Sequence, residues 1–180
     1  MPSFEVLLPI GAIAFYVYDS AVLLYGNELA LERARTGWRT SAGLPLQIAR
    51  RRPFVPNPLA PGALLFRVRW DVEPGAPTDA AFDVEALRTA LTSLRALVTL
   101  QALLMFVVLP PTSILLGAGR LLLAVFVFYY LLSFAAVGML IVKRRTLRVP
   151  SRRIAGLALE SLLCAPFAAN MVRKVSLARS

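Results

Sequence analysis

Asp19 and Tyr16 have the strongest potential for chemistry in this sequence, because both lie in an apolar stretch that could cross a membrane. Ionisable groups within a span are costly and tend to face the protein interior or a wet cavity. Tyr16 precedes the carboxylate by three residues, so both side chains share a helix face, and the phenol could donate a hydrogen bond to Asp19. Tyr18 and Glu160 complete the predicted set of intramembrane polar or partner-binding residues.

The pattern leaves the role of these acids open. Asp19 could pair with an arginine such as Arg95 or with another helix and fix packing, could handle protons or ions, or could pair with another subunit. On an interfacial helix Glu160 would face water or an arginine, whereas on a true span it would form half of a buried acidic pair with Asp19. Cys164 lies between apolar residues and is typical of a small buried side chain.

Several kinds of site are excluded by residues that the chain lacks. It has no histidine and one cysteine, which excludes His-ligated haem, the usual catalytic zinc sites, an intrachain disulfide and Ser-His or Cys-His pairs. Glycine-rich phosphate loops, nucleophile elbows and dinucleotide fingerprints are absent from the sequence. We therefore predict no cofactor, no metal and no catalytic residue, and an enzymatic role is disfavoured.

The composition is typical of an integral membrane protein. The chain is 58% hydrophobic and 17% charged, with a mean hydropathy of +0.67, which is too apolar for an ordinary soluble domain. The net charge of +10 fits the positive-inside rule, and no nucleic-acid module surrounds Trp38 and Trp70, so no nucleic-acid partner is expected. Arginine far outnumbers lysine, which fits a GC-rich bacterial genome.

The apolar runs predict a mainly α-helical membrane fold with three transmembrane helices, possibly four. Residues 1–25 are predicted to form the first helix, because the run over 6–25 is long enough for a hydrocarbon core of about 30 Å. Residues 93–142 are predicted to form a transmembrane hairpin whose first helix is kinked or ended by Pro110 and Pro111. Within residues 143–180, the stretch 154–171 is interfacial, re-entrant or a fourth span.

The basic residues predict the orientation. The segment "KRRTLRVPSRR" at 143–153 carries six basic residues and no acid, so this end of the hairpin is expected in the cytoplasm. Counting back along the chain places residues 26–92 in the cytoplasm and the N-terminus outside. We therefore expect the protein in the plasma membrane, the inner membrane of a bacterium.

The insert over residues 26–92 is rich in arginine and proline and predicts a small antiparallel sheet of about four strands plus a linker. The stretch "NELALERAR" would serve equally well as a continuation of the first helix, and Asp79 or Asp83 could cap the helix that follows the linker. Eight arginines lie between Arg33 and Arg69, and five acids lie between Asp71 and Glu85. These two stretches either contact each other or leave a basic face for anionic lipid.

The stretch "IARRRPFVPNPLAPG" could present a preordered surface, because its prolines leave little conformational freedom. Together with the basic segment it supplies the residues expected to contact a partner or lipid headgroups on the cytoplasmic side: Arg50, Arg51, Arg52, Phe54, Asn57, Lys143, Arg144, Arg145, Arg152 and Arg153.

These features favour a non-catalytic membrane subunit or scaffold. Its polar first helix and basic cytoplasmic domain would dock onto another membrane protein, or onto further copies of the chain, with anionic lipid headgroups as additional contacts. One alternative is a small oligomeric channel or transporter with Asp19 on an intramembrane path. A second alternative is a membrane-embedded enzyme that modifies lipid.

Overall fold

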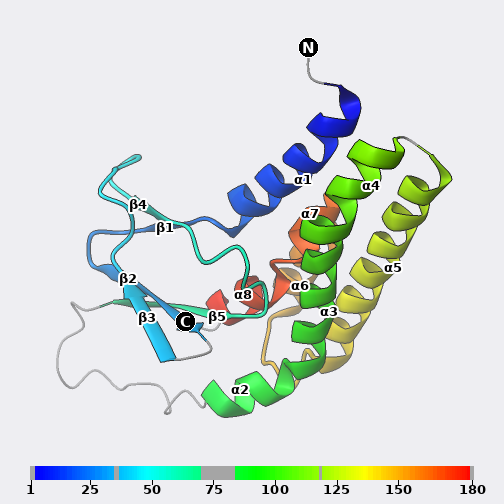
Figure 1. The fold of residues 1–180 in the computed structure, drawn as a ribbon. Helices are drawn as coiled ribbons and strands as arrows, with labels where there is room; N and C mark the ends of the chain where they lie inside the picture. The colour runs from blue at the N-terminus through cyan, green and yellow to red at the C-terminus, as the bar shows by residue number, and fades with distance from the viewer. Residues whose placement is uncertain (1–2, 35–36, 70–83, 118, 179–180) are drawn as a thin grey trace.

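The computed structural model describes residues 3–34, 37–69, 84–117 and 119–178. Long helices lie on one side of the molecule and a small β region lies on the other (Figure 1). The predicted class, mainly helical with a β-rich insert after the first helix, is confirmed at this level.

Helix α1 (Phe4–Ser20) ends five residues before the predicted boundary. The chain turns into extended backbone at Ala21 and continues as strand β1 (Val22–Leu24). Leu24 is fully buried and packs with Phe54, so strand pairing here outweighs a longer helix. With 17 residues, α1 is about 26 Å long, just short of a full hydrocarbon core.

In the described part of the chain, two helices are long and apolar enough to cross a membrane, at residues 92–116 and 120–143. They correspond to the predicted hairpin, and the prediction of three transmembrane helices is not confirmed. The first contains α3 (Thr92–Leu103), the π-helical turn η1 (Leu104–Val108) and α4 (Leu109–Leu116), and the second is α5 (Arg120–Lys143). A short helix, α2 (Val84–Ala90), precedes α3.

Pro110 and Pro111 do not end the helix, which continues to Leu116. A proline ring collides with the carbonyl four residues before it and removes one backbone donor. The π-helical turn η1 ends two residues before Pro110, so the carbonyls four residues before both prolines lie in its wider spacing, which makes room for the rings. Gly117, with a left-handed φ of 68°, ends α4.

The β region contains a three-stranded antiparallel sheet and a two-stranded ribbon. Strands β3 (Gly37–Ser41), β2 (Glu28–Ala34) and β5 (Leu64–Arg69) form the sheet in that order, and β1 pairs with β4 (Arg52–Phe54). The stretch that could have extended the first helix therefore forms β2. It pairs along both edges, which satisfies its backbone groups as a helix would.

The C-terminal stretch forms three short helices, α6 (Ser151–Leu163), α7 (Ala165–Ala168) and α8 (Met171–Leu177). The backbone leaves helical geometry at Cys164, two residues before Pro166. Helix α6 packs on α5, α7 packs on α1, and α8 returns to strand β5, where Ser176 Oγ accepts a hydrogen bond of 3.0 Å from the Leu65 amide. Residues 154–171 thus follow a broken, returning path, with no continuous fourth span.

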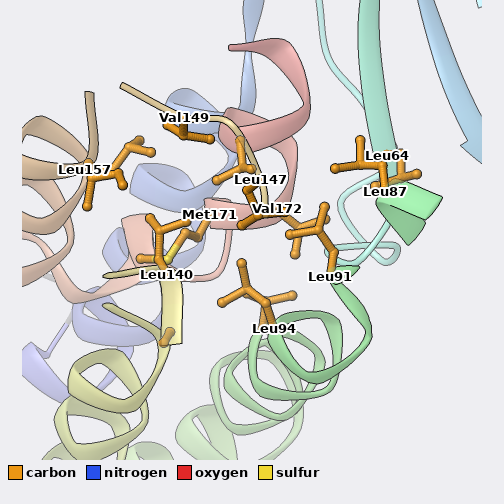
Figure 2. Close-up of a cluster of buried hydrophobic side chains, with 14 of the residues drawn as sticks. Leu64, Leu87, Leu91, Leu94, Leu140, Leu147, Val149, Leu157, Met171 and Val172 are labelled. Carbon is orange, nitrogen blue, oxygen red and sulfur yellow. The ribbon is translucent and has the colours of Figure 1, made fainter. Parts of the chain in front are cut away.

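One apolar cluster joins the sheet to the hairpin (Figure 2). It includes Leu64 of β5, Leu94 of α3, Leu140 of α5, Leu147 of the α5–α6 connection and Val172 of α8. Close-packed side chains leave few voids and resist displacement. This shared cluster therefore holds the β region and the helices in one arrangement.

Candidate polar site at the end of helix α1

The last turn of α1 faces the C-terminal helices. Tyr16 is fully buried, and its ring meets Phe106 edge to face with centroids 5.5 Å apart. Its hydroxyl donates to the Pro58 carbonyl oxygen at 2.8 Å. The hydrogen bond expected from Tyr16 to Asp19 is therefore not formed, because the proline-rich loop comes close enough to take the phenolic proton. Tyr18 projects outward and is largely exposed.

Asp19 is held by two residues of the C-terminal segment. Its carboxylate accepts from Lys174 Nζ at 2.6 Å and from Asn170 Nδ2 at 3.0 Å, and its side chain is 9% exposed. Lys174 also contacts Glu160 at 2.7 Å, so the two acids share one ammonium group. Of the roles open to Asp19, the geometry matches pairing with another helix of the same chain.

Arg95 is not the partner of Asp19. Its Nε donates to the Gly62 carbonyl oxygen at 2.8 Å. Gly62 packs closely against the Arg95 side chain, since a Cβ added at Gly62 would lie 3.4 Å from the Arg95 Cβ. Arg95 thus connects α3 to the loop before β5.

Arg173, which the sequence did not single out, is the centre of the site. It is 2% exposed, and one amino group donates to Tyr16 Oη at 3.1 Å and to Asn170 Oδ1 at 2.9 Å. The other donates to the carbonyl oxygens of Asn57 and Ala60. A single guanidinium therefore connects α1, α8 and the proline-rich loop.

A sequence signal for this residue does exist. Asn170, Arg173 and Lys174 are spaced by three and four residues, which places them on one helix face.

A cavity of about 870 Å³ lies beside the site. Its walls come from the end of α1, from α6 and from α7–α8, and its polar lining includes Asp19, Glu160, Asn170 and Lys174. Arg152 and Arg153, both predicted contact residues, also line it. The structure thus brings together residues from both predicted groups.

The remaining predicted contact residues divide by exposure. Phe54 is only 3% exposed and belongs to the core with Leu24 and Leu65, so it is not available as a surface contact. The backbone of Asn57 is engaged, because its amide donates to Glu32 Oε1 at 3.1 Å. The residue itself is exposed, as are Arg50, Arg144, Arg145, Arg152 and Arg153.

Three other predicted basic residues contact the chain itself. Arg51 lies over the Tyr25 ring, 4.4 Å from its centroid, and also bonds its hydroxyl, and Arg52 is in strand β4. Lys143 donates to the Ala90 carbonyl oxygen at 2.8 Å, which ties the end of α5 to α2.

The basic and acidic stretches of the insert meet at one described point, where Arg33 lies 3.8 Å from Glu85. Asp79 and Asp83, the candidate helix caps, lie outside the described residues. Trp38 packs against Phe66 and beneath Arg33.

Cys164 lies at the break between α6 and α7. Burial raises the pKa of its thiol, and the nearby Asp19 carboxylate adds to the increase. The thiol therefore stays protonated at neutral pH and is a weak nucleophile. Among the described residues, no group of three His, Cys, Asp or Glu side chains is placed to hold a metal ion.

Comparison of the chain with protein-family models, with curated proteins and with solved structures found no match. The inferences about function below therefore rest on the geometry and on physical chemistry.

Proposed function

We propose that this chain is a non-catalytic integral membrane subunit that docks onto another membrane protein through its cytoplasmic β region. Two apolar helices compatible with membrane crossing support the location. Under the positive-inside rule, the basic residues after α5 place the β region in the cytoplasm and the start of α1 outside. The arginine-rich composition favours the inner membrane of a bacterium.

The observation that carries the proposal is the surface of the β3–β4 loop, residues 42–51. Leu44, Leu46 and Ile48 are 50%, 61% and 51% exposed, and Arg50, two residues further on, is exposed as well. Large apolar side chains gathered on one loop with an adjacent arginine resemble the apolar centre and basic edge of a protein interface.

This loop is ordered before any partner binds. The Leu44 amide donates to the Pro53 carbonyl oxygen at 2.7 Å, and Ile48 and Arg51 exchange backbone hydrogen bonds of 2.8 and 3.0 Å. Gly43 has a left-handed φ of 86° and packs against Arg52 so closely that a Cβ would lie 2.9 Å from the Arg52 Cβ. A preordered loop loses little entropy on binding, which favours recognition.

The polar end of α1 supports a structural role within the chain. Asp19 lies between Lys174 and Asn170, so it does not need a carboxamide or cation from a second protein. An oligomeric channel would require this carboxylate on an open path, and a lipid-modifying enzyme would require Asp19 or Glu160 to be released from Lys174. We therefore assign docking to the β3–β4 loop.

The test is affinity purification of the tagged chain from its native membranes in mild detergent, with mass spectrometry and sizing. The unaltered chain should recover a foreign membrane protein in stoichiometric amount. The substitution Leu46→Ser should release that protein, because it removes an apolar contact from the centre of the loop.

Leu59→Ser is the matched control, since Leu59 is 75% exposed and lies outside the loop. It should leave recovery of the partner unchanged. A chain that purifies alone or only with copies of itself would contradict docking onto another protein. Equal loss with both variants would contradict the assignment to the β3–β4 loop.

A further inference from the structure

We propose that the cavity between α1, α6 and α8 binds an anionic amphiphile, a phospholipid whose phosphate lies near Arg152, Arg153 and Arg173 and whose acyl chains contact the apolar side chains of the wall. This goes beyond docking to a protein. It rests on the membrane location of the chain and not on the β3–β4 loop.

The first argument is the incomplete neutralisation of Arg173. Arg173 is 2% exposed and is one of the residues that line the cavity. The four hydrogen-bond acceptors of its guanidinium are the neutral oxygens of Tyr16, Asn170, Asn57 and Ala60. Its Nε is buried without a hydrogen-bond partner in the described residues. A buried charge is costly unless an opposite charge compensates it.

The closest compensation for this charge is indirect. Glu32 is buried and accepts from the Asn57 amide at 3.1 Å, while the Asn57 carbonyl accepts from Arg173. One residue, Asn57, thus separates the carboxylate from the guanidinium. In the part of the chain that the structure describes, no carboxylate lies within 4.0 Å of Arg173. An anion in the cavity would supply the missing charge.

The second argument is the charge distribution along the cavity wall. The two acids of the wall, Asp19 and Glu160, both contact Lys174. Arg152 and Arg153, by contrast, are exposed in the first turn of α6 and form no ion pair with a described residue. The start of this 13-residue helix adds partial positive charge on the same side. A phosphate group would therefore find guanidinium partners that no carboxylate occupies.

The third argument is the apolar remainder of the cavity. Val22, Leu157, Phe167 and Leu177 line it beside the charged residues. A volume of about 870 Å³ is far larger than a phosphate ion needs and falls in the range of pockets that bury most of an organic ligand. A wall that holds both charged and large apolar side chains matches a ligand with an anionic head and hydrocarbon tails.

The experiment measures binding of short-chain lipids to the full chain purified in mild detergent. Dihexanoylphosphatidylglycerol is the anionic probe, dihexanoylphosphatidylcholine is the zwitterionic control, and inorganic phosphate is the competitor without a chain. The variant Arg152→Gln/Arg153→Gln is compared with Arg144→Gln/Arg145→Gln, which removes the same charge from exposed residues outside the cavity wall.

We expect the anionic lipid to bind more tightly than the zwitterionic one. The Arg152→Gln/Arg153→Gln variant should bind it roughly 3- to 10-fold more weakly, the effect of losing two partly exposed ionic contacts. The Arg144→Gln/Arg145→Gln variant should bind as the unaltered chain does. Equal weakening in both variants, or no preference between the lipids, would overturn the proposal.

Competition by inorganic phosphate distinguishes a lipid headgroup from a free anion. Phosphate should displace the lipid only at concentrations far above that of the lipid. Displacement at equal concentration would overturn the amphiphile proposal, because the apolar walls would then contribute nothing. The assay needs no partner protein, so its failure and the failure of docking are separate results.

Discussion

Replacing Arg173 with methionine should destabilise the protein more than any surface substitution. The methionine chain fills most of the volume of the arginine stem but offers no hydrogen-bond donor. The carbonyl oxygens of Asn57 and Ala60 and the side-chain oxygen of Asn170 would each lose the guanidinium as donor. Tyr16 keeps its own bond to the Pro58 carbonyl oxygen, so it is not counted as a loss.

The size of the effect follows from these three acceptors. A buried acceptor left without a donor costs about 1–3 kcal/mol, and removal of the uncompensated charge offsets part of the sum. We therefore expect a loss of about 3–5 kcal/mol in the free energy of unfolding. For a chain of this size that corresponds to roughly 6–20 °C in Tm.

The measurement is thermal unfolding of the full chain in detergent, followed by circular dichroism. Arg152→Gln is the control, since this exposed arginine should change stability by less than about 0.5 kcal/mol. Arg173→Lys should fall between the two, because one ammonium cannot reproduce the planar fork of donors. A Tm for Arg173→Met within about 2 °C of the unaltered protein would refute the assignment of Arg173 as the central connection.

Two further substitutions test neighbouring parts of the structure by the same unfolding assay. Gly43→Ala should cost about 1–3 kcal/mol, because the left-handed backbone and the 2.9 Å approach to the Arg52 Cβ leave no room for a methyl group; an unchanged Tm would contradict this packing. Asp19→Asn should lower the free energy of unfolding by about 1–3 kcal/mol, because it weakens a partly buried ion pair to Lys174. Glu160→Gln should lower it by at most about 0.5 kcal/mol, because Glu160 is the more exposed of the two acids that contact Lys174. Equal losses of unfolding free energy in the two variants would contradict the expectation that the more buried ion pair contributes more to stability.

The helices of the hairpin could be predicted from sequence because their signal is local. The uninterrupted apolar run at 121–142 is long enough to cross a hydrocarbon core, where a single segment satisfies its backbone hydrogen bonds only as a helix. The structure has α5 over Arg120–Lys143. The end of α1 could not be predicted in the same way. The apolar run continues past Ser20 without a break in composition, and the chain leaves the helix because β1 finds a partner in β4, about thirty residues later.

The candidate site illustrates the same limit. Asp19 stood out because an acid in an apolar run is conspicuous, whereas its partner Lys174 is 155 residues away in sequence. Arg173 resembled an ordinary basic residue near a chain end, and only the fold brings the Asn57 and Ala60 carbonyls to it. Phe54 was expected on a surface because prolines flank it, but long-range packing against Leu24 buries it.

The proposed function depends on one orientation, with the start of α1 outside the cell membrane and the β region in the cytoplasm. Single cysteines at Ser3 and at Arg50, each introduced after Cys164→Ser, test it with a membrane-impermeant maleimide on spheroplasts of a bacterium that expresses the chain. Ser3→Cys should be labelled in intact spheroplasts, and Arg50→Cys only after permeabilisation. Labelling of Arg50→Cys from outside, or protection of both cysteines, would contradict the account.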